Sequence, residues 1–268
     1  MSLRGFHIVF IIVTTLLSLF LVGWALFLAP VSAGLMSCTV RRAVASPAPP
    51  VVLVHGAAMD HTVWAMHMRY FMHVGRSVIA PDLPAHGRSN GEAVTSVEAM
   101  AGWLLRCMDA FGIEAGAVAG HSMGALVALE TAATGSSRVE RLALLGASVP
   151  MPVSDQLLDA ASEDRPQARD MMMLWGHGFD AQFGANPVAG IHVMNTASRL
   201  LERAPSGLLF NDLYASNAYL RGREAAAQVT APTTIISTRG CDRGARDGPR
   251  ICTKSSSSGP RSTALSRQ

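Results

Sequence analysis

The chain has 268 residues, of which 49% are hydrophobic and 15% are charged. This length suits one large α/β domain or two small ones, and the composition excludes disordered, collagen-like and disulfide-stapled chains. The formal net charge of +3 comes from residues 239–268, which hold seven basic and two acidic residues, so residues 1–238 sum to −2. A slightly acidic body is not typical of a nucleic-acid surface, and we expect no nucleic-acid partner.

Residues 1–34 are predicted to form a hydrophobic anchor or signal segment. From Ile8 to Leu28 the chain carries no charge and is apolar apart from two threonines, a serine and a glycine. About twenty such residues span a hydrocarbon core of roughly 30 Å, whereas the apolar region of a cleaved signal is usually about 7–15 residues long. We therefore favour an N-terminal transmembrane helix, with the following domain on the non-cytoplasmic side. The alternatives are a cleaved signal, which gives a secreted or periplasmic protein, and a later start of translation.

The first part of the predicted domain, residues 48–150, alternates short apolar runs with helical patterns. Continuous apolar runs are typical of strands buried on both faces, and they are found at residues 50–54, 77–80, 117–119 and 141–145. Helical spacing covers residues 61–74, residues 97–111 behind a capping box of Thr95 and Glu98, and residues 122–134. This order predicts an α/β fold with a doubly wound, mostly parallel sheet and helices on both faces.

The second half of the chain breaks this alternation. Residues 151–224 are mostly helical in pattern, as an inserted helical cap would be, and residues 225–237 contain the last recognisable core strand at 233–237. Residues 238–268 have no apolar period and no aromatic residue, and they include four consecutive serines. They are predicted to be a disordered basic tail rich in Ser, Arg and Gly.

The four cysteines form no CxxC pair and no metal-type spacing with the nine histidines. Neither a zinc site nor a disulfide framework is therefore predicted. No phosphate-binding or dinucleotide-binding glycine motif occurs either. We expect no metal and no cofactor, and the sequence leaves the oligomeric state open.

The strongest chemical signal is the pentapeptide from Gly120 to Gly124, which reads Gly-His-Ser-Met-Gly. A G-x-S-x-G motif between a strand and a helix is the nucleophile elbow, with its serine at a sharp turn. The helix that begins at the serine directs backbone N–H groups and the positive end of its dipole at the reacting centre. The alternative is a glycine-rich turn that only lets helix and strand pack.

Two further motifs accompany the elbow: residues 55–57 (His-Gly-Ala) after the first strand and residues 81–89 after the next strand. With these three motifs, residues 50–237 resemble the α/β-hydrolase superfamily. The pattern is most similar to the small esterase, perhydrolase and C–C-bond hydrolase branches. Ser122 argues against dehalogenases and epoxide hydrolases, which have an aspartate at the elbow.

The resemblance implies a role for each of these residues. Ser122 would attack a carbonyl carbon and form an acyl-enzyme, and the N–H groups of Ala57 and Met123 would hold the oxyanion. His86 and Asp82 would order their own loop. The residues that would support the motifs are His55, Gly56, Gly120, His121 and Gly124.

Two catalytic parts are expected after the last strand. Asp242 is the candidate acid, although it lies about one residue further from Pro232 than the usual pattern expects. No histidine follows that strand, because His192 is the last histidine in the chain. His177 and His192 in the cap are the remaining candidates for a base, but neither stands where the fold delivers one.

A frameshift or sequencing error near codon 238 is one explanation of the missing histidine. Arginine outnumbers lysine 21 to 1 in the chain, which indicates GC-rich coding DNA, and such DNA translated out of frame yields mostly Arg, Gly, Ala, Pro and Ser. A natural basic tail that binds anionic lipid is the alternative.

The sequence thus predicts a serine hydrolase, similar to carboxylic-ester hydrolases, that cleaves a small ester or related acyl substrate. Its activity is expected to be impaired, because the catalytic histidine is not found. A non-catalytic remnant or binding module of the same fold is the alternative, and a cofactor-free perhydrolase uses the same triad. Residues 171–175 (Met-Met-Met-Leu-Trp) would either line an apolar substrate pocket or form the core of the cap.

Overall fold

The computed structural model describes residues 38–41, 48–183 and 192–236 of the chain. Within these residues a sheet of six strands is ordered β1-β3-β2-β4-β5-β6. Every neighbouring pair is parallel except β1 and β3, which run antiparallel. The strands are β1 (Cys38–Arg41), β2 (Val51–Val54), β3 (Val78–Pro81), β4 (Gly116–His121), β5 (Val139–Leu145) and β6 (Thr233–Ile236). The predicted mostly parallel α/β sheet is therefore confirmed, whereas β1 was not predicted.

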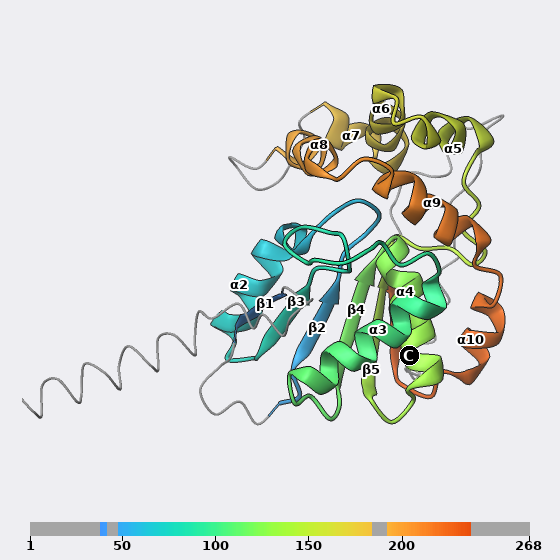
Figure 1. Ribbon diagram of the computed structural model, residues 1–268. Helices are drawn as coiled ribbons and strands as arrows, with labels where there is room; N and C mark the ends of the chain where they lie inside the picture. The colour runs from blue at the N-terminus through green and yellow to red at the C-terminus, as the bar shows by residue number, and fades with distance from the viewer. Residues whose placement is uncertain (1–37, 42–47, 184–191, 237–268) are drawn as a thin grey trace, which may run out of the picture.

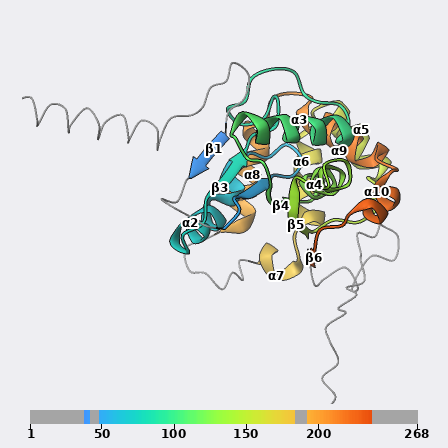
Figure 2. The same cartoon turned by 90° about the horizontal axis from the view of Figure 1, so that it is seen from below.

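Helices cover both faces of this sheet, as predicted. Figure 2 shows α3, α4 and α10 on one side of the sheet and α2 on the other. Because both faces are covered, all four residues of β2 and all four of β3 are buried, which explains their continuous apolar sequences. The helices beside the sheet are the 3-10 helix η1 (His61–Trp64), α2 (Ala65–His73), α3 (Val97–Ala110), α4 (Met123–Thr134) and α10 (Gly222–Gln228).

The predicted capping box of α3 was wrong by one residue. The N-cap is Ser96, which has extended backbone angles and a hydroxyl that accepts a hydrogen bond of 3.2 Å from Ala99 N. The cap is therefore not Thr95 paired with Glu98. Serine and threonine are both good caps, so the sequence alone did not distinguish two adjacent candidates.

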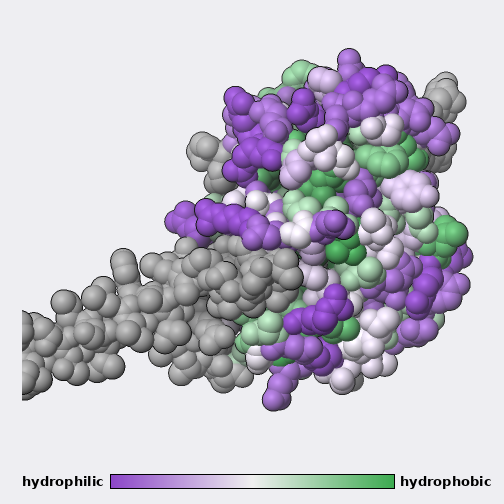
Figure 3. Space-filling model, viewed as in Figure 1, coloured by the Kyte–Doolittle hydropathy of each residue, from purple (hydrophilic) through white to green (hydrophobic). Residues whose placement is uncertain are grey.

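The described helices between β5 and α10 gather over the end of the sheet where the parallel strands have their carboxyl ends (Figure 1). They are α5 (Asp155–Ser162), α6 (Pro166–Gly176), α7 (Phe179–Gln182), α8 (Val193–Arg203) and α9 (Leu208–Ala218). Helix α8 buries Ala197, Leu200 and Leu201 on one face. The outer surface of these helices is largely hydrophilic in Figure 3, as expected for a layer that packs only inward. We call α5 to α9 the cap.

Strand β6 lies at the margin of the sheet (Figure 2). It pairs with β5, and within the described residues it has no second neighbour. All four of its residues are exposed, including Ile235 at 50% and Ile236 at 51%. This edge therefore presents apolar side chains to solvent.

Several predictions lie outside the described residues. They concern the N-terminal segment 1–34, the tail 238–268 and the candidate acid Asp242. Within the described ranges, no helix combines the length and the hydropathy that a membrane span requires.

Candidate active site

Ser122 lies between β4 and α4 in a strained backbone conformation. Its φ of 55° and ψ of −123° belong to a region that non-glycine residues rarely adopt, at a cost on the order of 1–3 kcal/mol. Two hydrogen bonds hold the turn: Ser122 N donates to Leu145 O at 2.9 Å, and Ala125 N donates to Ser122 O at 2.9 Å. A strained serine between a strand and a helix is the geometry of a nucleophile elbow.

The glycines around Ser122 allow backbone segments to approach closely. A Cβ atom on Gly120 would lie 2.0 Å from Gly124 O, and a Cβ atom on Gly124 would lie 2.3 Å from His55 O. On Gly56 a Cβ atom would lie 3.3 Å from both Ser122 Cβ and His121 Nδ1. The first two positions therefore admit only glycine, and the third places the loop after β2 directly beside the serine.

The loop after β2 contains one of the two predicted oxyanion donors, Ala57 N, directly after Gly56. It turns at residues 57 and 58, where Met59 N donates to Gly56 O at 3.2 Å and Ala58 has a φ of 52°. Ala57 N and Met123 N, the two predicted oxyanion donors, belong to buried residues. Among the residues that the structure describes, neither N–H donates to a protein acceptor. Two buried N–H groups without a partner beside a serine are suited to an oxyanion.

His55 joins the loops that follow β2 and β3. Its Nδ1 is 2.9 Å from Gly56 O, and its Nε2 accepts a hydrogen bond of 3.1 Å from Leu83 N. Complete burial lowers the pKa of His55 to about 4, so the ring is neutral and donates through Nδ1. Both ring nitrogens are engaged in backbone contacts, which makes His55 a loop-ordering residue.

His86 makes a buried ion pair with the cap. Its Nε2 lies 2.7 Å from Oδ2 of Asp212 on α9, and its Nδ1 lies 2.9 Å from Pro84 O. Both partners are acceptors, so both ring nitrogens carry a proton. Burial lowers the pKa of His86, but the hydrogen bond and charge of Asp212 outweigh burial and raise it above its usual value.

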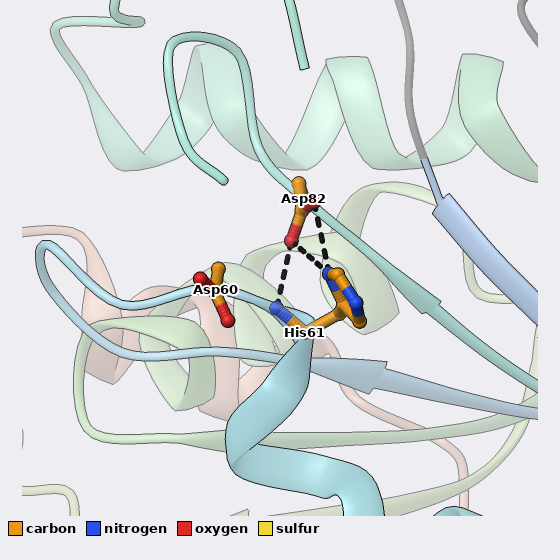
Figure 4. A group of neighbouring side chains, drawn as sticks. All are labelled: Asp60, His61 and Asp82. Atoms are coloured by element: carbon orange, nitrogen blue, oxygen red, sulfur yellow. Dashed lines mark hydrogen bonds and ion pairs between the residues drawn. The ribbon is translucent and has the colours of Figure 1, made fainter. Parts of the chain in front are cut away.

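Asp82 links the loop after β3 to the start of η1, and Figure 4 shows its contacts with His61. Its carboxylate accepts hydrogen bonds from His61 N at 2.7 Å, from His61 Nδ1 at 2.9 Å and from Arg88 N at 3.0 Å. The hydrogen bond to Asp82 raises the pKa of His61. Burial would raise the pKa of Asp82, but the hydrogen bonds from His61 and Arg88 lower it.

Asp60 lies beside this pair (Figure 4) and completes a cluster whose ligand atoms lie within 4.8 Å of one another. Asp60 caps η1 through Thr62 N at 2.8 Å and accepts from Arg203 Nη2 of α8 at 2.9 Å. A divalent cation would have to displace these donors from both carboxylates. The contacts therefore describe a structural network that joins two loops and the cap.

The hydrogen bonds of the described histidines do not include one to the Ser122 hydroxyl. Among the described residues, no side chain hydrogen-bonds to its hydroxyl. His177 Nδ1 lies 3.0 Å from Met173 O, and His192 Nδ1 accepts from Asn195 N at 3.1 Å as the N-cap of α8. The two cap histidines are thus engaged within the cap.

Two hollows border the cap. One of about 230 Å³ lies between the loop after β2 and helices α8 and α9, and Ala58, Arg88 and Leu200 line it. Another of about 480 Å³ opens within the cap beside Met173 and Met194. Of the methionine-rich stretch, Met173 is buried, whereas Leu174 and Trp175 are 57% and 49% exposed. Of residues 171–175, only Met173 lines the hollow within the cap.

Comparison with known proteins identifies the family. Residues 49–235 match the family model described as alpha/beta hydrolase fold. The chain belongs to the alpha/beta hydrolase fold family. The predicted resemblance is thereby confirmed.

Two curated relatives match shorter segments. One is the dihydrolipoyllysine-residue acetyltransferase component of the acetoin cleaving system of Cupriavidus necator, 40% identical over 96 residues, which are 35% of this chain and 25% of that protein. Another is the (E)-2-((N-methylformamido)methylene)succinate hydrolase of Acinetobacter baylyi, 32% identical over 97 residues, or 36% of each chain. The matches thus span about a quarter to a third of these relatives' lengths.

Solved structures share the fold over a larger part of the chain. The enol-lactonase from Burkholderia xenovorans LB400 has a TM-score of 0.63 at 22% identity and covers 75% of this chain and 78% of its own. The esterase EaEST from Exiguobacterium antarcticum has a TM-score of 0.60 at 21% identity, covering 75% and 76%. At such identities the likeness establishes the fold alone.

Asp212, which contacts Ala58 N and His86, was not predicted from the sequence. A signal was present, because Asp212 lies among Leu208, Leu209, Leu213 and Ser216 on the buried face of α9. A carboxylate on a buried helix face needs partners, but its sequence does not say which partners these are.

Proposed function

We propose that the chain is a serine hydrolase that cleaves a small ester, lactone or related acyl substrate through an acyl-enzyme. The observation that carries this proposal is the strained Ser122 beside the unpartnered N–H groups of Ala57 and Met123. The proposal is supported by relatives and structural neighbours described as a hydrolase, an enol-lactonase and an esterase. A perhydrolase activity would use the same residues.

The chemistry proceeds in two balanced steps. The Ser122 hydroxyl oxygen bonds to the acyl carbon, and the carbonyl oxygen becomes an oxyanion that the N–H groups of Ala57 and Met123 stabilise. Each donor contributes about 2.7–4 kcal/mol in such sites. The alcohol leaves with a proton, and water then attacks the ester to release the acid and restore the serine.

We further propose that turnover is impaired. No described residue accepts the Ser122 proton, so transfer to water replaces transfer to a base. Loss of the base in serine hydrolases costs on the order of 10⁶ in rate and leaves about 10³–10⁴ over water. Asp242 remains the proposed acid, as the resemblance implies.

The test is acylation of the full-length protein by p-nitrophenyl acetate, followed by release of p-nitrophenolate and intact mass spectrometry. We expect an acetyl adduct that maps to Ser122 and slow turnover above background, both absent in Ser122→Ala. The absence of an adduct and of turnover in the wild-type protein would contradict the proposal.

A non-catalytic binding module is the second candidate, favoured by the absence of a described base at Ser122. It predicts saturable binding of an acyl ligand by the wild-type protein without adduct formation. Equilibrium dialysis with a non-hydrolysable amide analogue of the ester, beside the acylation assay, distinguishes the two.

We also propose that residues 1–34 anchor the chain in a membrane, with the hydrolase domain on the non-cytoplasmic side. Their uncharged apolar stretch supports this location. Alkaline carbonate extraction of membranes tests it. Release of the full-length chain into the supernatant would contradict an anchor.

A further inference from the structure

The Asp212 carboxylate connects the cap to the loop beside Ser122. Asp212 is fully buried on α9, and its Oδ2 atom accepts two hydrogen bonds of 2.7 Å, from Ala58 N and from His86 Nε2. Its Oδ1 accepts a third from Asn211 Nδ2 at 3.1 Å. Two of the three donors belong to loops of the sheet, so this side chain fixes the cap to the core.

The contact with Ala58 acts one peptide away from the oxyanion donor. Met59 N closes the turn onto Gly56 O at 3.2 Å, and Ala58 has a positive φ of 52°. A turn with a positive φ at this position favours glycine, so an alanine needs external support to remain there. Asp212 supplies that support, because its carboxylate accepts the hydrogen bond from Ala58 N within this turn.

Charge strengthens the arrangement. His86 lies between Asp212 and Pro84 O and donates to both, so the buried Asp212 carboxylate faces an imidazole that carries a proton on each ring nitrogen. Charge-assisted hydrogen bonds are shorter and roughly twice as strong as neutral ones. The turn at Ala57 and Ala58 is therefore held by a charged acceptor from the cap.

We propose that Asp212 is a positioning residue for the oxyanion hole, which couples docking of the cap to the orientation of the Ala57 N–H. Asp212 does not touch the substrate. This inference rests on the proposed function for the role of Ala57, whereas the coupling of Asp212 to the loop stands on the contacts alone.

The experiment compares Asp212→Ala with a matched control, Tyr219→Phe. The control also removes a buried hydrogen bond of 2.7 Å between cap and core, but at Glu130 on α4. Hydrogen–deuterium exchange of residues 57–59 reports on the loop. The rate constant of Ser122 acylation by p-nitrophenyl acetate and the KM for this ester report on the oxyanion hole.

In Asp212→Ala we expect faster exchange at residues 57–59 and an acylation rate constant lower by about 10²-fold, as misplacement of a catalytic group causes. KM should change little, and Tyr219→Phe should leave exchange at 57–59 and acylation unchanged. Wild-type exchange at 57–59 in a folded Asp212→Ala protein would overturn the coupling. Equal losses of acylation in both variants would overturn the positioning role.

The experiment still gives a result if Asp212→Ala does not fold or if the wild-type protein is not acylated. If Asp212→Ala does not fold, Asp212→Asn is used, because its amide retains one oxygen acceptor but loses the charge. If wild-type Ser122 is not acylated, the proposed function fails. Exchange at residues 57–59 then still decides whether Asp212 holds the loop.

Discussion

The Tyr219 hydroxyl donates a hydrogen bond of 2.7 Å to the Glu130 carboxylate. Tyr219 follows the last residue of α9 and Glu130 lies on α4, the helix that begins after Ser122, and both residues are buried. Arg221 Nη1 lies 3.4 Å from the other carboxylate oxygen. The end of the cap is therefore fixed to the helix that carries the elbow.

Tyr219→Phe removes this donor and leaves the buried Glu130 carboxyl group without it. We expect the free energy of unfolding to fall by about 1–3 kcal/mol, the usual cost of an unsatisfied buried group. Urea denaturation followed by circular dichroism measures the change. The same substitution in a Glu130→Leu background, which lacks the acceptor, should cost less, and equal costs in both backgrounds would show that the pair does not interact.

Gly124→Ala should prevent close packing of α4 on the loop after β2. Its Cβ atom would lie 2.3 Å from His55 O, and backbone cannot yield as a flexible side chain does. We expect a loss of about 3 kcal/mol or more, at the upper end of overpacking costs, measured by thermal unfolding. Gly178→Ala is the matched control, because nothing lies within 4 Å of its Cβ position. Comparable unfolding temperatures for both variants would contradict this account.

His55 should make the protein sensitive to mild acid. Burial lowers its pKa from 6.5 to about 4 in the folded state, so the unfolded chain binds the proton first as pH falls. Stability is fully present above pH 6.5 and is lost as pH falls toward 4, by up to about 3 kcal/mol. Urea midpoints at several pH values measure the loss. His55→Gln should flatten the profile between pH 6.5 and 4, and an unchanged slope would exclude His55 as its source.

The exposed β6 edge should promote self-association. Apolar edge strands are a template for pairing with another chain, and Ile235 and Ile236 are both about half exposed. Ile235→Lys should lower the apparent mass at high protein concentration in light scattering. Leu220→Lys, at a leucine that is 77% exposed outside the sheet, is the control and should have no such effect. A wild-type mass that does not depend on concentration would refute the prediction.

Much of the fold could be predicted because local patterns determine it. Buried strands β2 and β3 are continuous apolar runs, and the glycine spacing around Ser122 marks the elbow. Strand β1 was missed because its four residues, Cys-Thr-Val-Arg, have no such run. It is recognised only by its pairing with β3, whose residues lie about forty positions later in the sequence.

The site could be predicted only where it is local in sequence. Short sequence motifs contain Ser122, Met123 and Ala57, so the motif pattern alone identifies these positions. Asp212 contacts Ala58 across 154 positions, and no periodicity encodes a contact of that kind. Likewise, the positive φ of Ala58 could not be foreseen, because alanine does not favour this conformation.

The position of Asp212 on α9 has a consequence for the order in which the site is built during translation. The elbow at Ser122 and the turn at Ala57 both precede Leu145, whereas Asp212 emerges from the ribosome only after most of the cap. Contacts between residues close in sequence form early, and long-range contacts form late. Under the proposed positioning role of Asp212, a nascent chain would form the turn at Ser122 before the cap can hold the loop at Ala57 and Ala58. The proposed site would then be completed only after α9 has been synthesised and has packed on this loop.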